Sequence, residues 1–113
     1  MKSALRIANI GLASLGLLAT ATAAQAEPPA VYYSWRATDI TATACITQAG
    51  QALASQNLTP IQADATSVAG RSEVATAVFV CLENSDATTV MVIVAGADDD
   101  QTLALREALK VAF

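Results

Sequence analysis

The sequence contains no histidine among its 113 residues. This absence excludes catalytic systems in which histidine is the general base, such as Ser-His-Asp and Cys-His, and every metal site built on imidazole. Positive charge is also scarce, with six Lys and Arg against ten Asp and Glu. So few scattered cations cannot form the basic patch with which proteins follow nucleic-acid phosphates. The sequence therefore predicts neither a histidine-dependent enzyme nor a nucleic-acid-binding protein.

Charged residues are absent from residues 7–24, a stretch dominated by Ala, Leu and Gly. Lys2 and Arg6 precede this stretch, and Ala24-Gln25-Ala26 follows it with the small-x-small pattern of a cleavage site. The Thr-containing second half of the stretch is weakly hydrophobic and no cationic flank follows it, so we favour cleavage over a retained membrane anchor. We predict that residues 1–26 are a signal peptide.

The predicted mature chain is one small acidic domain. Residues 27–113 carry four cations and ten acids, a formal net charge of −6. We expect residues 27–30, with two prolines, to be a flexible N-terminal segment, and residues 31–113 to form a single domain. The signal peptide predicts a periplasmic or secreted protein, and its Ala-rich composition favours a bacterial envelope. We expect no membrane association after cleavage.

Only two cysteines, Cys45 and Cys81, are present, and both lie in the mature part. An even pair in an oxidising compartment predicts a disulfide. A redox-active pair would favour Cys-x-x-Cys spacing, and two thiolates without histidine make a poor zinc site. The predicted bridge spans 36 positions.

The hydrophobic pattern predicts an α+β fold with the order β-α-β-β-β-α. A stripe at helical spacing, which includes Cys45, predicts a helix that begins after Thr38 or Asp39 and runs to about Gln56. Asn57 suits a left-handed position after that helix. We expect a small antiparallel sheet of three to four strands with both helices on one face. Strands are predicted at residues 31–35, 61–65, 74–83 and 88–95, a polar loop at 66–73, and a second helix from Asp98 to residue 113.

Part of this order, α-β-β-β-α, resembles that of double-stranded-RNA-binding domains. The resemblance is limited to element order. Asp98, Asp99 and Asp100 open the last helix, and these acids would repel phosphates. We therefore reject RNA binding for this chain.

Acidic side chains are the most abundant candidates for chemistry. The run Asp98–Asp100 is typical of a helix start, where acids meet the positive end of the helix dipole, and three consecutive carboxylates diverge too much for a calcium loop. The remaining acidic candidates are Asp64, Glu73, Glu83 and Asp86. Their spacing does not force any two of them to face each other, as a general acid and a general base would have to. We therefore assign no catalytic residue, no metal site and no cofactor.

The two strongest strands are apolar on both faces. If Cys45 lies on the buried side of its helix, strand alternation directs Cys81 and Phe79 toward the helices. The loop at residues 84–87 then pairs Phe79 with Val92 and Val80 with Met91. Both helices pack on one face of the sheet, so the other face is apolar and uncovered. Such a face is typical of an interaction surface. The predicted partner-binding residues are Val78, Val80, Leu82, Met91 and Ile93.

Three of the five aromatic residues lie together in the first predicted strand. Alternation places Tyr33 and Trp35 on one side and Tyr32 and Arg36 on the other. We expect Tyr33 and Trp35 to anchor this strand in the core. The alternative is an aromatic edge formed by Tyr32, Trp35 and Arg36 that binds a sugar or peptide.

The sequence thus supports three functional hypotheses. The first is an exported, non-enzymatic module that forms a homodimer or binds a protein partner through the apolar sheet face. The second is a small-ligand binder that uses the aromatic edge near Trp35. The third is a small hydrolase, which the missing histidine disfavours.

Overall fold

The computed structural model describes residues 27–113, so the predicted signal peptide, residues 1–26, lies outside the described residues. The chain forms an α+β domain with a five-stranded antiparallel sheet, two helices and one disulfide. The fold class is as predicted, with five strands in place of three to four. The elements are β1 (Ala30–Thr38), α2 (Ala42–Ser55), β2 (Thr59–Ala63), β3 (Ser67–Arg71), β4 (Ala75–Glu83), β5 (Thr88–Gly96) and α3 (Asp99–Ala112).

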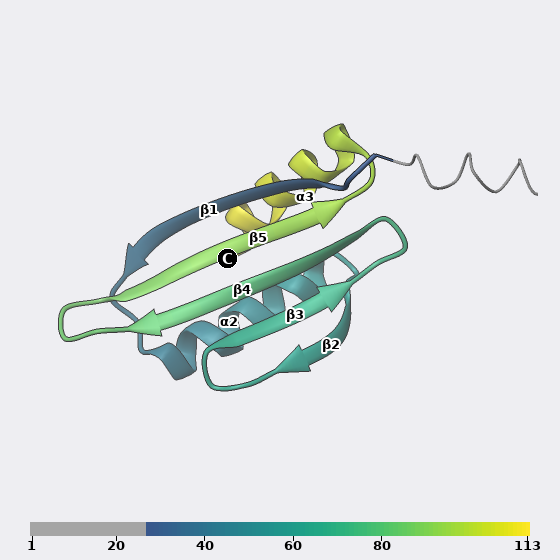
Figure 1. Cartoon of the computed structure of the whole chain (residues 1–113). Helices are drawn as coiled ribbons and strands as arrows, with labels where there is room; N and C mark the ends of the chain where they lie inside the picture. The colour runs from purple at the N-terminus through teal and green to yellow at the C-terminus, as the bar shows by residue number, and fades with distance from the viewer. Residues whose placement is uncertain (1–26) are drawn as a thin grey trace, which may run out of the picture.

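The sheet has the order β1-β5-β4-β3-β2, and both helices lie behind it in Figure 1. α3 contacts β5 and β1, whereas α2 contacts β4 and β3. No element among residues 27–113 covers the opposite face, toward the viewer. The domain therefore has two layers, and its core lies between the helices and one face of the sheet.

The additional strand is β3, which occupies most of the predicted polar loop at residues 66–73. Gly70 suggests a turn in the sequence, but it lies inside this strand and its φ is not positive. A Cβ atom on Gly70 would lie 2.9 Å from the Cβ of Leu58. Glycine is needed here because β3 packs closely against the segment that follows α2. The prediction of a loop was therefore wrong.

Helix α2 begins later than predicted. Its N-cap is Thr41, whose hydroxyl oxygen accepts a hydrogen bond from the backbone N–H of Ala44 at 3.1 Å. Thr38 is instead the last residue of β1, where it pairs with Thr88. β1 pairs with β5 along its whole length, and it therefore extends beyond the predicted strand at residues 31–35.

The C-terminal end of α2 follows the sequence prediction. Asn57 has a left-handed backbone, with φ of 61°. The backbone N–H of Leu58 donates to the carbonyl of Leu53 at 3.1 Å, and that of Asn57 donates to the carbonyl of Ala54 at 2.9 Å. These are the two hydrogen bonds of a Schellman motif. They turn the chain from α2 into β2.

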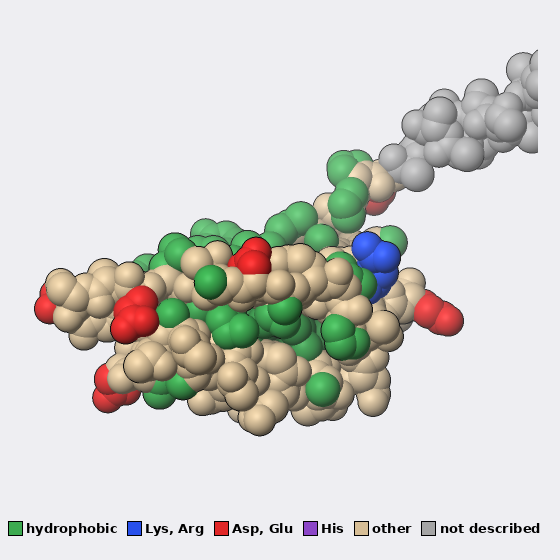
Figure 2. Space-filling model, turned by 90° about the horizontal axis from the view of Figure 1, so that it is seen from below, with side chains coloured by type: hydrophobic (Ala, Val, Ile, Leu, Met, Phe, Trp, Pro, Cys, Tyr) green, Lys and Arg blue, Asp and Glu red, His purple; other side chains and the backbone are tan. Residues whose placement is uncertain are grey.

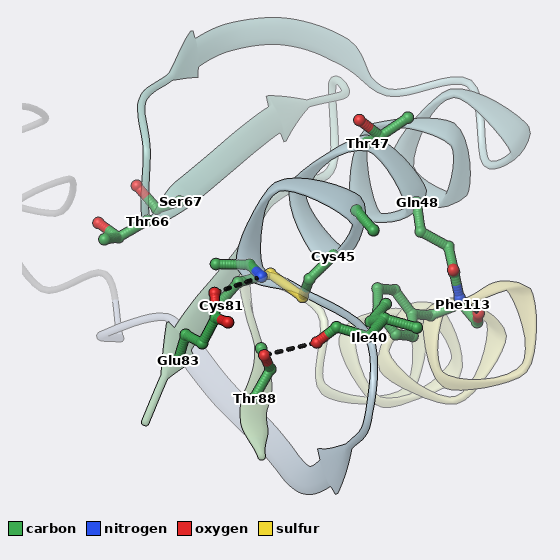
Figure 3. The surroundings of a disulfide bond; sticks show 12 residues. Ile40, Cys45, Thr47, Gln48, Thr66, Ser67, Cys81, Glu83, Thr88 and Phe113 are labelled. Atoms are coloured by element: carbon green, nitrogen blue, oxygen red, sulfur yellow. Dashed lines mark hydrogen bonds between the residues drawn. A yellow bond between two sulfur atoms is a disulfide. The ribbon is translucent and has the colours of Figure 1, made fainter. Parts of the chain in front are cut away.

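The disulfide joins α2 to the centre of the sheet (Figure 3). Cys45 and Cys81 have Cα atoms 6.1 Å apart, and both residues are fully buried. Beside the bridge, the hydroxyl of Thr88 donates to the carbonyl of Ile40 at 2.6 Å. The predicted disulfide is therefore present, and it fixes α2 against β4.

Candidate functional site

The side of the sheet that faces away from the helices is the candidate functional site. β4 and β5 pair Phe79 with Val92 and Val80 with Met91, the register that the loop length predicts. Phe79 and Val92 are buried beneath the helices, whereas Val80 and Met91 are partly exposed. The alternation along both strands is therefore as predicted.

Strand β1 enlarges this side of the sheet. Trp35 pairs with Met91 and Tyr33 pairs with Ile93, so both aromatic residues continue rows that begin on β4. The expectation that Tyr33 and Trp35 anchor β1 in the core was wrong, because they are 60% and 62% exposed. Both helices lie on the other face, and Tyr32 is the residue that points toward α3.

We call this surface the open face and define it by the outward positions of the three strands. None of these positions carries a charge. Arg71 of the neighbouring strand β3, which pairs with Thr76 of β4, is a charged position on the same side of the sheet. Viewed along the sheet, hydrophobic side chains follow the upper contour of the domain (Figure 2). The open face consists of Val31, Tyr33, Trp35, Ala37, Thr76, Val78, Val80, Leu82, Thr89, Met91, Ile93 and Ala95.

All five residues predicted to bind a partner lie on the open face. Leu82, at one end of β4, is 53% exposed. The other four are partly exposed because their neighbours on adjacent strands shield them. The sequence did not predict that Val31, Tyr33 and Trp35 lie on the same surface as these five residues. Their alternation was the available signal, but it does not tell which side of β1 meets the helices.

The three residues of the alternative ligand site do not project from the same face of β1. Tyr32 lies on the helix side, where its hydroxyl donates a hydrogen bond to Asp99 Oδ1 at 2.7 Å. This hydrogen bond to a carboxylate raises the pKa of Tyr32 above its usual value. The Arg36 guanidinium lies 5.3 Å from the centre of the Phe113 ring, also on the helix side. Trp35 projects to the open face, although at the edge of the sheet it also borders a cleft that Arg36 lines.

A separate cleft of about 340 Å³ lies on the helix side, near the end of α3. Arg36 and Trp35 of β1 border it, together with Lys110 and Phe113. In the sequence, Lys110 is a cation near the end of the last predicted helix, and no pattern connects it with Arg36. The two residues are 74 positions apart, and only the packing of α3 against β1 brings them to one site.

Two of the candidate acidic side chains accept hydrogen bonds from backbone N–H groups. Asp64 accepts hydrogen bonds from the backbone N–H groups of Thr66 and Ser67, which lower the pKa of its carboxyl group. Glu83 accepts a hydrogen bond from the backbone N–H of Ala42 at the start of α2, at 2.9 Å. Within residues 27–113 the structure contains no group of three or more acidic or cysteine side chains that could hold a metal ion.

No helix within residues 27–113 is long and apolar enough to cross a membrane. The buried disulfide fits a protein that folds outside the reducing cytoplasm.

No family model, curated protein or solved structure matches this chain.

Proposed function

We propose that this domain is an exported, non-enzymatic interaction module that forms a weak homodimer through the open face. The observation that carries the proposal is the continuity of this face across β1, β5 and β4, with no charged side chain among its outward positions. Soluble domains cover such a surface or use it for binding. A covering segment from the same chain is absent among residues 27–113.

A second copy of the chain is the occupant that this surface favours. A partner with a charged surface would lose hydration against the open face without gaining an ion pair. A second open face carries no such cost, and two sheets can stack about 10 Å apart with their strands nearly aligned. All ten acids of residues 27–113 lie outside the open face, so the net charge of −6 does not place like charges in the contact.

The size of the open face predicts a weak dimer. Three strands of nine residues each span roughly 30 by 14 Å, so an interface would bury about 800–1,200 Å² in total. This is the range of weak or transient association. Burying an aliphatic side chain contributes about 1.5–3 kcal/mol, whereas association costs about 4–15 kcal/mol. The balance is close, and we expect a concentration-dependent equilibrium.

Val80→Lys tests the proposal, because Val80 lies on the central strand β4 and pairs with Met91. Sedimentation equilibrium of the exported protein should show dimerisation for the wild type, and the variant should stay monomeric with a nearly unchanged melting temperature. Ala54→Lys is the matched control, because it adds the same charge at an exposed position of α2. This control should dimerise as the wild type does.

A wild type that is monomeric at millimolar concentration would overturn the homodimer. If Val80→Lys then also abolished binding of another exported protein while Ala54→Lys did not, the open face would have a different occupant. Equal loss of dimerisation in both variants would point to a nonspecific charge effect and would also contradict the proposal.

A further inference from the structure

The cleft near the end of α3 exists because the helix covers only part of β1 and β5. α3 ends behind the middle of β5, and the last residues of β1 extend beyond it (Figure 1). Val90 and Val92 of β5, with Phe79 of β4, line the apolar base of the cleft. The Phe113 ring stacks against that of Phe79 with their centres 5.4 Å apart. The volume of about 340 Å³ lies within the usual range for small-molecule sites.

The charge around this cleft is opposite to that of the domain. Residues 27–113 contain four cationic and ten acidic side chains, yet two of the four cations, Arg36 and Lys110, line the cleft and no acidic side chain does. Arg36 has no salt bridge to an acidic side chain within the described part of the chain. Lys110 Nζ lies 3.5 Å from Glu107 Oε2, on an exposed part of α3. The cleft thus combines an apolar base with a positive rim.

We infer that this cleft binds a small amphiphilic monocarboxylate. Its carboxylate would meet the Arg36 guanidinium, whose planar array of N–H donors suits a two-oxygen acceptor, and the Lys110 ammonium would add a second positive charge. Its apolar body would lie against Val90, Val92 and the Phe113 ring. A ligand with several charges fits less well, because beyond these two cations the lining is largely apolar.

This inference is independent of the proposed homodimer. The cleft lies on the helix side of the sheet and the open face lies on the other side, and Trp35, on the edge strand β1, is the one open-face residue that also borders the cleft. Val80→Lys should therefore abolish dimerisation and leave binding in the cleft unchanged. Either proposal can fail while the other stands.

Titration calorimetry of the exported protein with octanoate tests the inference, with octanamide and acetate as companion probes. Octanoate should bind one site per chain, and octanamide, which keeps the tail but lacks the charge, should bind at least about tenfold more weakly. Acetate, which keeps only the charge, should show no measurable binding. Arg36→Gln and Lys110→Gln should each weaken octanoate binding about tenfold.

Arg71→Gln is the matched control, because it removes one cation on the open-face side of β3 and should leave octanoate binding unchanged. If Arg36 serves only to stack on Phe113, Arg36→Gln lowers the melting temperature while Lys110→Gln leaves octanoate binding intact, and the inference is wrong. Equal affinity for octanoate and octanamide, equal weakening by Arg71→Gln, or no saturable octanoate binding would also overturn it. NMR shift changes should cluster at Val90 and Val92, and a cluster at Met91 and Ile93 would place the ligand on the open face instead.

Discussion

The two faces of the strands β4 and β5 are both largely apolar but lie in opposite environments. On the covered face, Phe79, Val92 and Val94 are at most 4% exposed. On the open face, Val80 and Ile93 are just as apolar but remain partly exposed. The difference therefore arises from the connections of the chain. α2 and α3 both pack on the same side of the sheet, and no third helix among residues 27–113 covers the other.

This comparison shows that hydropathy alone does not identify a core. Both strands would fit a buried sheet with helices on its two faces. The covered face is distinguished by Cys81, because its disulfide partner lies on the buried side of α2. The open face is distinguished by the exposed aromatic residues of β1 and by the absence of charged side chains from its outward positions. The following predictions test how far the two faces differ.

Removing the disulfide should have the largest effect, because it attaches α2 to the covered face. Cys45→Ala/Cys81→Ala should lower the free energy of unfolding by about 2–5 kcal/mol, measured by urea denaturation. Trypsin cuts after Arg36, Arg71 and Arg106, so the two cysteines fall on separate peptides. In the purified wild type these peptides should migrate as one species until they are reduced. Free thiols in freshly purified protein would contradict the bridge.

The next largest effect should be the difference in stability loss between the same Val→Ala substitution made on the covered face and on the open face. Val94→Ala opens a cavity beneath α3, where Val94 is fully buried, and should cost about 2 kcal/mol. Val80→Ala leaves a partly exposed site on the open face and should cost less than about 1 kcal/mol in the monomer. Urea denaturation at low protein concentration measures both. Equal costs would mean that the open face is also covered in the monomer.

Much of this two-faced arrangement follows from local sequence. The loop at residues 84–87 sets the pairing of Phe79 with Val92, and Asn57 with Leu58 specifies the end of α2. The strand β3 could not be recognised, because Gly70 is required by the contact with Leu58 rather than by a turn. Local alternation also could not place Trp35, because the choice of face depends on where α3 packs. The Arg36–Lys110 cleft depends on the same packing of distant segments.

The start of α3 should contribute more modestly to the covered face. Asp98 caps the helix by accepting a hydrogen bond from the backbone N–H of Gln101 at 2.8 Å. Asp98→Ala should cost about 1 kcal/mol. Asp100→Asn should change the melting temperature little, because Asp100 is an exposed acid in the first turn. Calcium should not shift the melting temperature of the wild type. A rise of several degrees with calcium would instead make Asp98–Asp100 a cation site.

The smallest effect should come from Asp64, which lies in the β2–β3 turn beyond both faces. The backbone N–H groups of Thr66 and Ser67 donate to its carboxylate and lower its pKa in the folded chain. A folded pKa below the unfolded value of about 4 stabilises the protein above that pH, and this stabilisation is lost as pH falls through the folded value. Asp64→Asn should therefore lower the melting temperature slightly at pH 6, and the difference from the wild type should shrink toward pH 2. Asp86→Asn controls for the loss of a carboxylate in another turn. A constant difference across this pH range would show that the charge of Asp64 does not stabilise the turn.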